Sequence, residues 1–160
     1  MIKVFIAGGA GWAGSALSKG VFNNQNMKLV GALSRKHKGK NLAKILNLSS
    51  SNIPIYDDIE TALKEIDFDA LVDYTKPNIA KKNILSALKK GKKVVIGTSG
   101  LTEKDYSEIE KTANENNSSV LAVGNFAITV VLLQKFSEMA AKYIPNFEII
   151  DYTHEDKIDV

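Results

Sequence analysis

A glycine-rich segment directly follows the first apolar run of the sequence. It reads Gly8-Gly-Ala-Gly-Trp-Ala-Gly14 and contains G-x-G-x-x-G at Gly9, Gly11 and Gly14, or G-x-x-G-x-x-G counted from Gly8. Glycine at these positions allows a tight turn, a close approach of the backbone to a pyrophosphate and close packing of a helix on a strand. The pattern predicts a dinucleotide-binding loop, with a plain strand-to-helix turn as the alternative. Its members are Gly8, Gly9, Ala10, Gly11, Trp12, Ala13 and Gly14.

A basic segment lies about 20 residues beyond the glycine loop, where NAD-selective domains usually carry Asp or Glu. Here Ser34 is followed by Arg35, Lys36 and Lys38, and no acidic residue is nearby. The planar guanidinium of an arginine fits a phosphate group. We therefore expect Ser34 and Arg35 to contact the adenosine ribose and NADPH to be preferred over NADH. A solvated basic loop is the alternative.

Three later apolar runs each end in a turn of small or hydroxylated residues. These turns are Asp73-Tyr-Thr-Lys-Pro77, Gly97-Thr-Ser-Gly100 and Gly124-Asn-Phe-Ala127. Each is a common turn by itself, but ligands of open α/β sheets bind at the carboxyl ends of strands. Together they predict loops that contact the nicotinamide ribose. The expected cofactor-binding residues are Thr75, Gly97, Thr98, Ser99, Gly124, Asn125 and Phe126.

Near the end of the sequence, His154 and Lys157 are three positions apart and come after a predicted strand. Two cationic donors at this spacing suit a dicarboxylate ligand. An exposed polar connector is the alternative.

The elements that must position these residues alternate between apolar, β-branched runs and helical patterns. One amphipathic segment, residues 79–90, places Ile84, Leu85 and Leu88 on one face, and Thr102 with Asp105 forms a capping-box-like helix start. Strands that alternate with helices predict parallel pairing and an α/β fold with a doubly wound, mainly parallel sheet. The predicted strands are residues 2–7, 29–33, 53–56, 70–74, 94–96 and 120–123.

The character of the sequence changes after Asn125. A long apolar helix is predicted over residues 126–143 and a strand over residues 147–151, and the residues after them are densely polar. We expect residues 1–128 to form a Rossmann-type dinucleotide-binding domain and residues 129–160 to start a second domain that is incomplete here. A small addition to the first sheet is the alternative.

Composition excludes several classes of site within this sequence. There is no cysteine, so disulfides, thiolate metal ligands and a cysteine nucleophile are excluded, and His37 and His154 are the only histidines, so we expect no metal site. A net charge of +3 with scattered lysines argues against nucleic-acid binding. No apolar run reaches the ~18–20 residues of a membrane span, and no signal peptide is recognisable. We expect a cytoplasmic protein with a small-molecule substrate, bound neither to nucleic acid nor to a membrane.

Taken in order, these motifs resemble those of the 4-hydroxy-tetrahydrodipicolinate reductase (dihydrodipicolinate reductase) family. The glycine loop matches the family's G-x-x-G-x-x-G, Asp73-Tyr-Thr75 its D-F-T, Gly97-Thr-Ser-Gly100 its G-T-T-G and Asn125-Phe-Ala127 its N-F-S turn. The resemblance implies an oxidoreductase that reduces 4-hydroxy-tetrahydrodipicolinate to tetrahydrodipicolinate with NAD(P)H in lysine and diaminopimelate biosynthesis. It also implies a homotetramer built through a mixed α+β second domain, which would bind the substrate.

The family's catalytic stretch reads E-x-H-H-x-x-K-x-D-A-P-S-G-T. It is matched here by Asp151, Thr153, His154, Lys157 and Asp159. The resemblance implies that His154 and Lys157 bind the substrate carboxylate and serve in catalysis. Thr153 stands where the family has its proton-donating His, and a hydroxyl cannot act as a general acid near neutral pH.

These departures leave a second interpretation open. A non-catalytic relative, which binds dinucleotide for redox sensing or assembly, would also keep the fold and lose the acid. The glycine loop departs from the family too, because Trp12 replaces an Arg or Lys that is frequent there. A different oxidoreductase for amino-acid-derived carbonyls fits the turn motifs less well. We expect this chain by itself to bind cofactor but to show negligible reductase activity.

Overall fold

The computed structural model describes residues 1–48, 52–123 and 127–150 of the chain. The chain divides into two compact units, Met1–Ala122 and Val123–Val160.

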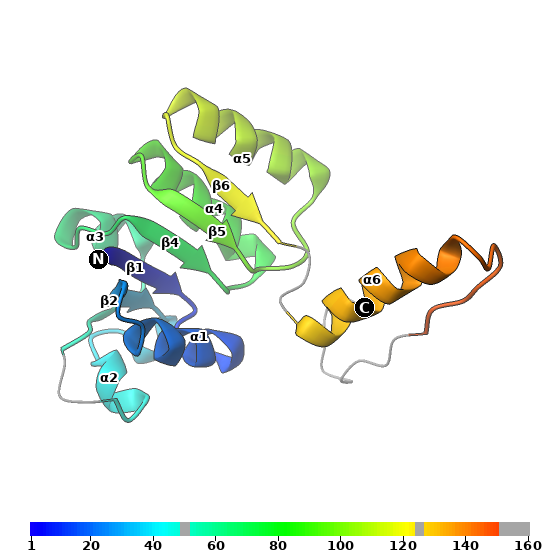
Figure 1. Cartoon of the computed structure of the whole chain (residues 1–160). Coiled ribbons are helices and arrows are strands. Elements are labelled where there is room, and N and C mark those ends of the chain that lie inside the picture. Colours follow the sequence, from blue (N-terminus) through cyan, green and yellow to red (C-terminus); the bar gives the residue numbers. More distant parts are fainter. Residues whose placement is uncertain (49–51, 124–126, 151–160) are drawn as a thin grey trace. The chain divides into compact units, whose positions relative to one another are not determined.

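In the first unit, the described residues form one six-stranded parallel sheet with the order β3-β2-β1-β4-β5-β6 (Figure 1). The chain starts in the middle at β1, builds outward through β2 and β3, then crosses back to β4, β5 and β6. This order confirms the predicted doubly wound α/β fold. It reverses at β1, and such a switch point is where open α/β sheets bind ligands. The strands are β1 (Ile2–Ala7), β2 (Met27–Leu33), β3 (Ile55–Tyr56), β4 (Ala70–Asp73), β5 (Lys93–Ile96) and β6 (Val120–Ala122).

Helices connect successive strands, and three of them begin at a side-chain cap, provided by Asn41, Asp58 and Thr102. The predicted capping box of α5 is confirmed: the Asp105 N–H donates to Thr102 Oγ1 at 3.2 Å, and the Thr102 N–H donates to Asp105 Oδ2 at 2.9 Å. No helix formed by the described residues is long and apolar enough to cross a membrane. In the first unit the helices are α1 (Trp12–Phe22), η1 (Arg35–His37), α2 (Leu42–Ile45), α3 (Ile59–Glu65), α4 (Pro77–Lys89) and α5 (Glu103–Glu115).

The central strands of the sheet are buried on both faces, which explains why they read as continuous apolar runs. Neighbouring side chains of β1 point to opposite faces, so that Phe5 enters one core cluster and Ile6 the other. The Phe5 face is covered by α3, α4 and α5, and the Ile6 face by α1 and α2. The carboxyl ends of the central strands are thereby held on a rigid base.

The second unit contains α6 (Ile128–Ala141), which confirms most of the helix predicted over residues 126–143. The strand predicted over residues 147–151 is wrong for residues 147–150, which have no regular structure. A strand requires a neighbour for its backbone N–H and C=O groups, and the described residues of this unit contain no other strand. Asp151 lies outside the described residues, and the assignment of residues 129–160 to a second domain stays a prediction.

Substitutions at two glycines should change the stability of the chain in opposite directions and thereby test this packing. Gly20 lies on α1 with nothing within 4 Å of an added Cβ, so Gly20→Ala should stabilise the chain by roughly 0.5–1 kcal/mol through helix propensity. Gly31 lies on β2, where an added Cβ would be 2.7 Å from the buried Phe5 ring, so Gly31→Ala should destabilise it by about 1–3 kcal/mol. Urea unfolding midpoints measure both effects. A Gly31→Ala variant as stable as the parent would contradict the packing of β1 on β2.

Candidate functional site

The glycine loop joins β1 to α1 through close backbone packing. Gly8 has a φ of +82°, a conformation that favours glycine, and a Cβ there would overlap the carbonyl oxygen of Tyr74 at the end of β4. A Cβ added to Gly14 would overlap the carbonyl oxygen of Gly8. The loop is therefore pressed against β4 on one side and against its own helix on the other, and neither position has room for a side chain.

The start of α1 presents backbone N–H groups that no side chain caps. Gly11 is the N-cap residue, and its N–H donates to the Gly8 carbonyl at 2.8 Å. The buried Ser18 hydroxyl donates to the Gly9 carbonyl at 3.0 Å, which fixes the loop on the helix. First-turn N–H groups lack intrahelical acceptors and lie at the positive end of the helix dipole. This arrangement suits a pyrophosphate.

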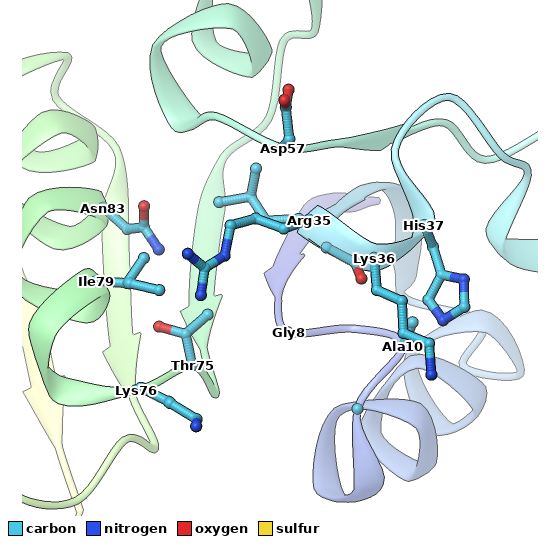
Figure 2. A pocket seen from close by; sticks show the side chains of 13 residues that line it. Gly8, Ala10, Arg35, Lys36, His37, Asp57, Thr75, Lys76, Ile79 and Asn83 are labelled. Carbon is cyan, nitrogen blue, oxygen red and sulfur yellow. The ribbon is translucent and has the colours of Figure 1, made fainter.

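A cavity of about 620 Å³ opens beside this loop at the carboxyl ends of the central strands. Its size is within the range of small-molecule sites, roughly 300–1,000 Å³. The glycine loop, the basic segment and the turn after β4 meet around it (Figure 2). The lining residues are Gly8, Ala10, Gly11, Leu33, Ser34, Arg35, Lys36, His37, Asp57, Thr75, Lys76, Ile79 and Asn83.

One wall of the cavity is basic. Ser34 precedes the short helix η1, and Arg35 and Lys36 are exposed on it. Figure 2 shows the Arg35 guanidinium pointing across the cavity toward Thr75 and Asn83. His37 also lines this wall, and its Nδ1 is buried without a hydrogen-bond partner among the described residues.

Lys38 belongs to an ion pair rather than to this wall. Its Nζ lies 2.7 Å from Asp57 Oδ2, and Lys38 does not line the cavity. The hydrogen bond from Lys38 lowers the pKa of Asp57, so this carboxylate stays charged. The sequence grouped Lys38 with Arg35 and Lys36, but the structure leaves those two on the cavity wall and pairs Lys38 with the acid just after β3.

The opposite wall is the turn after β4. The Thr75 N–H donates to Thr98 Oγ1 at 2.9 Å, so this turn is tied to the turn after β5. The Tyr74 ring fills the space beside Gly97, where a Cβ would overlap it, and burial raises the pKa of the Tyr74 hydroxyl. Two of the predicted turns are thus in direct contact.

The structure brings together much of the predicted site. Gly8, Ala10, Gly11, Ser34, Arg35 and Thr75 line the cavity. Gly9 and Gly14 are buried and closely packed, Ala13 is partly buried on α1, and Trp12 is 96% exposed at the start of that helix. Gly97, Thr98 and Ser99 lie next to Thr75 but not on the cavity wall. Gly124, Asn125, Phe126, His154 and Lys157 lie outside the described residues.

Sequence reasoning missed other lining residues. His37, Asp57, Lys76, Ile79 and Asn83 come from segments that only the fold brings to the cavity. One signal was present: Asn83 is a polar residue on the buried face of the helix predicted over residues 79–90, and it is buried in α4. The others carry no sequence pattern that marks them.

Comparisons with known proteins agree with this geometry. Residues 2–126 match the family model described as dihydrodipicolinate reductase, N-terminus. Curated 4-hydroxy-tetrahydrodipicolinate reductases from Bacillus cereus and Bacillus mycoides are each 37% identical over 158 residues, which cover 99% of this chain and 59% of the relative. The chain therefore spans 59% of the length of these relatives.

Solved structures share the fold. A dihydrodipicolinate reductase from Paenisporosarcina sp. TG-14, with dipicolinate bound, superposes with a TM-score of 0.75 at 33% identity, over 91% of this chain and 56% of that one. A scyllo-inositol dehydrogenase from Lactobacillus casei has a TM-score of 0.65 at 20% identity, over 89% and 42% of the two chains. The similarity to the scyllo-inositol dehydrogenase is a similarity of fold alone.

A substitution at Gly11 tests dinucleotide binding separately from folding. Its backbone is extended, and the nearest atom to an added Cβ is the Gly8 oxygen at 3.1 Å, so a side chain requires a shift of only a few tenths of an ångström. We expect Gly11→Val to stay folded by circular dichroism but to lose saturable binding of NADPH, because the side chain occupies the space of the pyrophosphate. Trp12, the single tryptophan, lies next to this position and supplies a fluorescence readout, and Gly20→Ala is the control. Undiminished binding by folded Gly11→Val would exclude this loop as the phosphate site.

Proposed function

Since the chain belongs to the dihydrodipicolinate reductase family, we propose that it provides the dinucleotide-binding part of a reductase. The reaction is the NAD(P)H-dependent reduction of 4-hydroxy-tetrahydrodipicolinate to tetrahydrodipicolinate in lysine and diaminopimelate biosynthesis. The observation that carries the proposal is the cavity at the switch point of the sheet, with the glycine loop on one side and Arg35 on the other.

The residues around the cavity fit a nicotinamide dinucleotide. The uncapped start of α1 suits phosphate groups, and Gly8 and Gly11 line the cavity without side chains. Arg35 and Lys36 provide polar groups for the adenosine end. We expect Thr75, Thr98, Gly97 and Ser99 to flank the nicotinamide end, because the turns after β4 and β5 are tied together. The contacts predicted for Gly124, Asn125 and Phe126 lie outside the described residues. When bound, the reduced nicotinamide supplies a hydride to the substrate.

The residues that we expect to bind the substrate lie outside the described part of the chain. We propose that His154 and Lys157 hold a carboxylate of the substrate and that one of them, or a bound water, delivers the proton that accompanies hydride transfer. Thr153 cannot take this role near neutral pH. Positioning matters because a misplacement of about 1 Å can cost roughly 100-fold in rate. A cytoplasmic homotetramer, expected from the family resemblance, belongs to the same proposal.

Thr153 also supports a second candidate function. A relative that has lost the proton-donating His of the family can still bind dinucleotide and act as a redox sensor or assembly factor. His154 and Lys157 favour the reductase, because a binding-only protein has no use for two cations at the substrate position.

We also propose that NADPH is preferred over NADH, and Arg35 provides the test. Charge-assisted hydrogen bonds contribute about 1.5–3 kcal/mol, so Arg35→Gln should weaken NADPH binding roughly 10-fold to 100-fold. NADH binding should change little, because NADH lacks the 2′-phosphate. Lys38→Gln is the matched control, since Lys38 is already paired with Asp57. Calorimetric titration of both cofactors into each variant gives the four affinities. Equal losses for NADH and NADPH in Arg35→Gln would show that Arg35 does not recognise the 2′-phosphate.

The reductase activity itself is tested by NADPH oxidation in the full-length protein with freshly generated 4-hydroxy-tetrahydrodipicolinate. We expect turnover in the parent and a loss of at least about 100-fold in Lys157→Ala, because the carboxylate contact that orients the substrate is removed. Lys142→Ala, a lysine of the second unit with no predicted role, is the control. A parent that binds NADPH without turnover would favour the binding-only candidate, and an active Lys157→Ala would remove Lys157 from the mechanism.

A further inference from the structure

The last residue of β4, Asp73, is a wholly buried acid that no predicted role uses. Its exposed fraction is 0%, and none of the ion pairs formed by the described residues includes it. A buried carboxylate is costly unless hydrogen bonds replace the lost water. A purely structural position at a strand end is filled at lower cost by an apolar residue, so the polar partners of Asp73 show what it does.

Those partners come from three different segments. Oδ1 accepts hydrogen bonds from the Thr75 N–H at 2.9 Å, the Thr75 hydroxyl at 2.6 Å and the Thr98 hydroxyl at 2.8 Å. Oδ2 accepts one from Nδ2 of Asn83 at 2.9 Å. Thr75 lies in the turn after β4, Thr98 in the turn after β5 and Asn83 in α4. One side chain thus fixes the separation of two neighbouring strand ends and of the helix between them in the chain.

Two of these partners, Thr75 and Asn83, line the cavity, whereas Asp73 does not. Because a carboxylate only accepts hydrogen bonds, it takes the hydroxyl hydrogen of Thr75. The Thr75 oxygen can then only accept a hydrogen bond from a ligand. Asp73 therefore gives this wall an acceptor opposite the donors Arg35 and Lys36 (Figure 2).

We propose that Asp73 is a positioning residue for the dinucleotide: it holds the turns after β4 and β5 at their binding distance and orients the Thr75 hydroxyl as an acceptor. The group that such an acceptor recognises is a donor at the nicotinamide end of the dinucleotide, such as a ribose hydroxyl. The basic wall receives the phosphate at the same time, so the two walls fix the direction of the bound nucleotide. This proposal rests on the proposed function.

The test compares Asp73→Ala and Asp73→Asn with the parent. Asp73→Ala removes the carboxylate that accepts four hydrogen bonds, and we expect the Kd for NADPH to rise roughly 10-fold or more. Asp73→Asn keeps the shape and the Oδ1 contacts but removes the charge, so its Kd should lie between those of the parent and Asp73→Ala. Thr112→Val is the matched control: the Thr112 hydroxyl is a buried donor to the Glu108 carbonyl in α5, remote from the cavity. It should lower stability without changing the Kd.

Hydrogen exchange supplies a readout that does not depend on binding. The Thr75 amide should exchange faster in Asp73→Ala than in the parent, while amides in the middle of β1 remain protected. Folded Asp73 variants that bind NADPH as tightly as the parent would overturn the proposal and leave the proposed function intact. A parent chain that binds no dinucleotide would overturn both. If Asp73→Ala does not fold, Asp73→Asn decides: an unchanged Kd contradicts the proposal, and a raised Kd supports it.

Discussion

The site depends on one steric constraint, the backbone-to-backbone contact between the glycine loop and the end of β4. The Tyr74 carbonyl lies where a side chain on Gly8 would be, and the Gly8 carbonyl lies where a side chain on Gly14 would be. This double contact brings the start of α1 down onto the carboxyl end of the sheet. The uncapped start of α1 then lies at the cavity, which Gly11 lines, and a helix N-terminus at this place suits a phosphate group.

The sheet makes this contact possible because β1 pairs with both β2 and β4 in parallel register. Ala7 lies opposite Leu33 on one side and Asp73 on the other, so three strands end at the same level. The segments after these three strands differ in chemistry: a glycine-rich loop, a basic helical turn and a turn held by a buried carboxylate. The cavity therefore offers backbone N–H groups, cations and a hydroxyl from three directions, and a dinucleotide has complementary groups at the same three places.

The sequence predicted the strands, their parallel order, the glycine loop and the capping box of α5, because these features depend on local periodicity and on residue types with special backbone requirements. It did not predict that Lys38 pairs with Asp57, since both are ordinary surface residues until β2 and β3 align. Nor did it predict the role of Asn83, whose position facing Asp73 depends on the docking of α4 on the sheet. The strand expected at residues 147–150 failed for a related reason: its apolar pattern is local, whereas strand formation requires a partner.

A nicotinamide dinucleotide should bind the carboxyl end of this sheet in one orientation. Mapping amide chemical-shift changes in the isotope-labelled chain during titration with NADPH tests this binding mode most directly. We predict saturable changes that concentrate at residues 8–14, 34–37, 74–76 and 97–99, with NADH causing smaller changes at 34–37 than NADPH. Changes that cluster on another face, or no saturable change at residues 8–14, would contradict this binding mode.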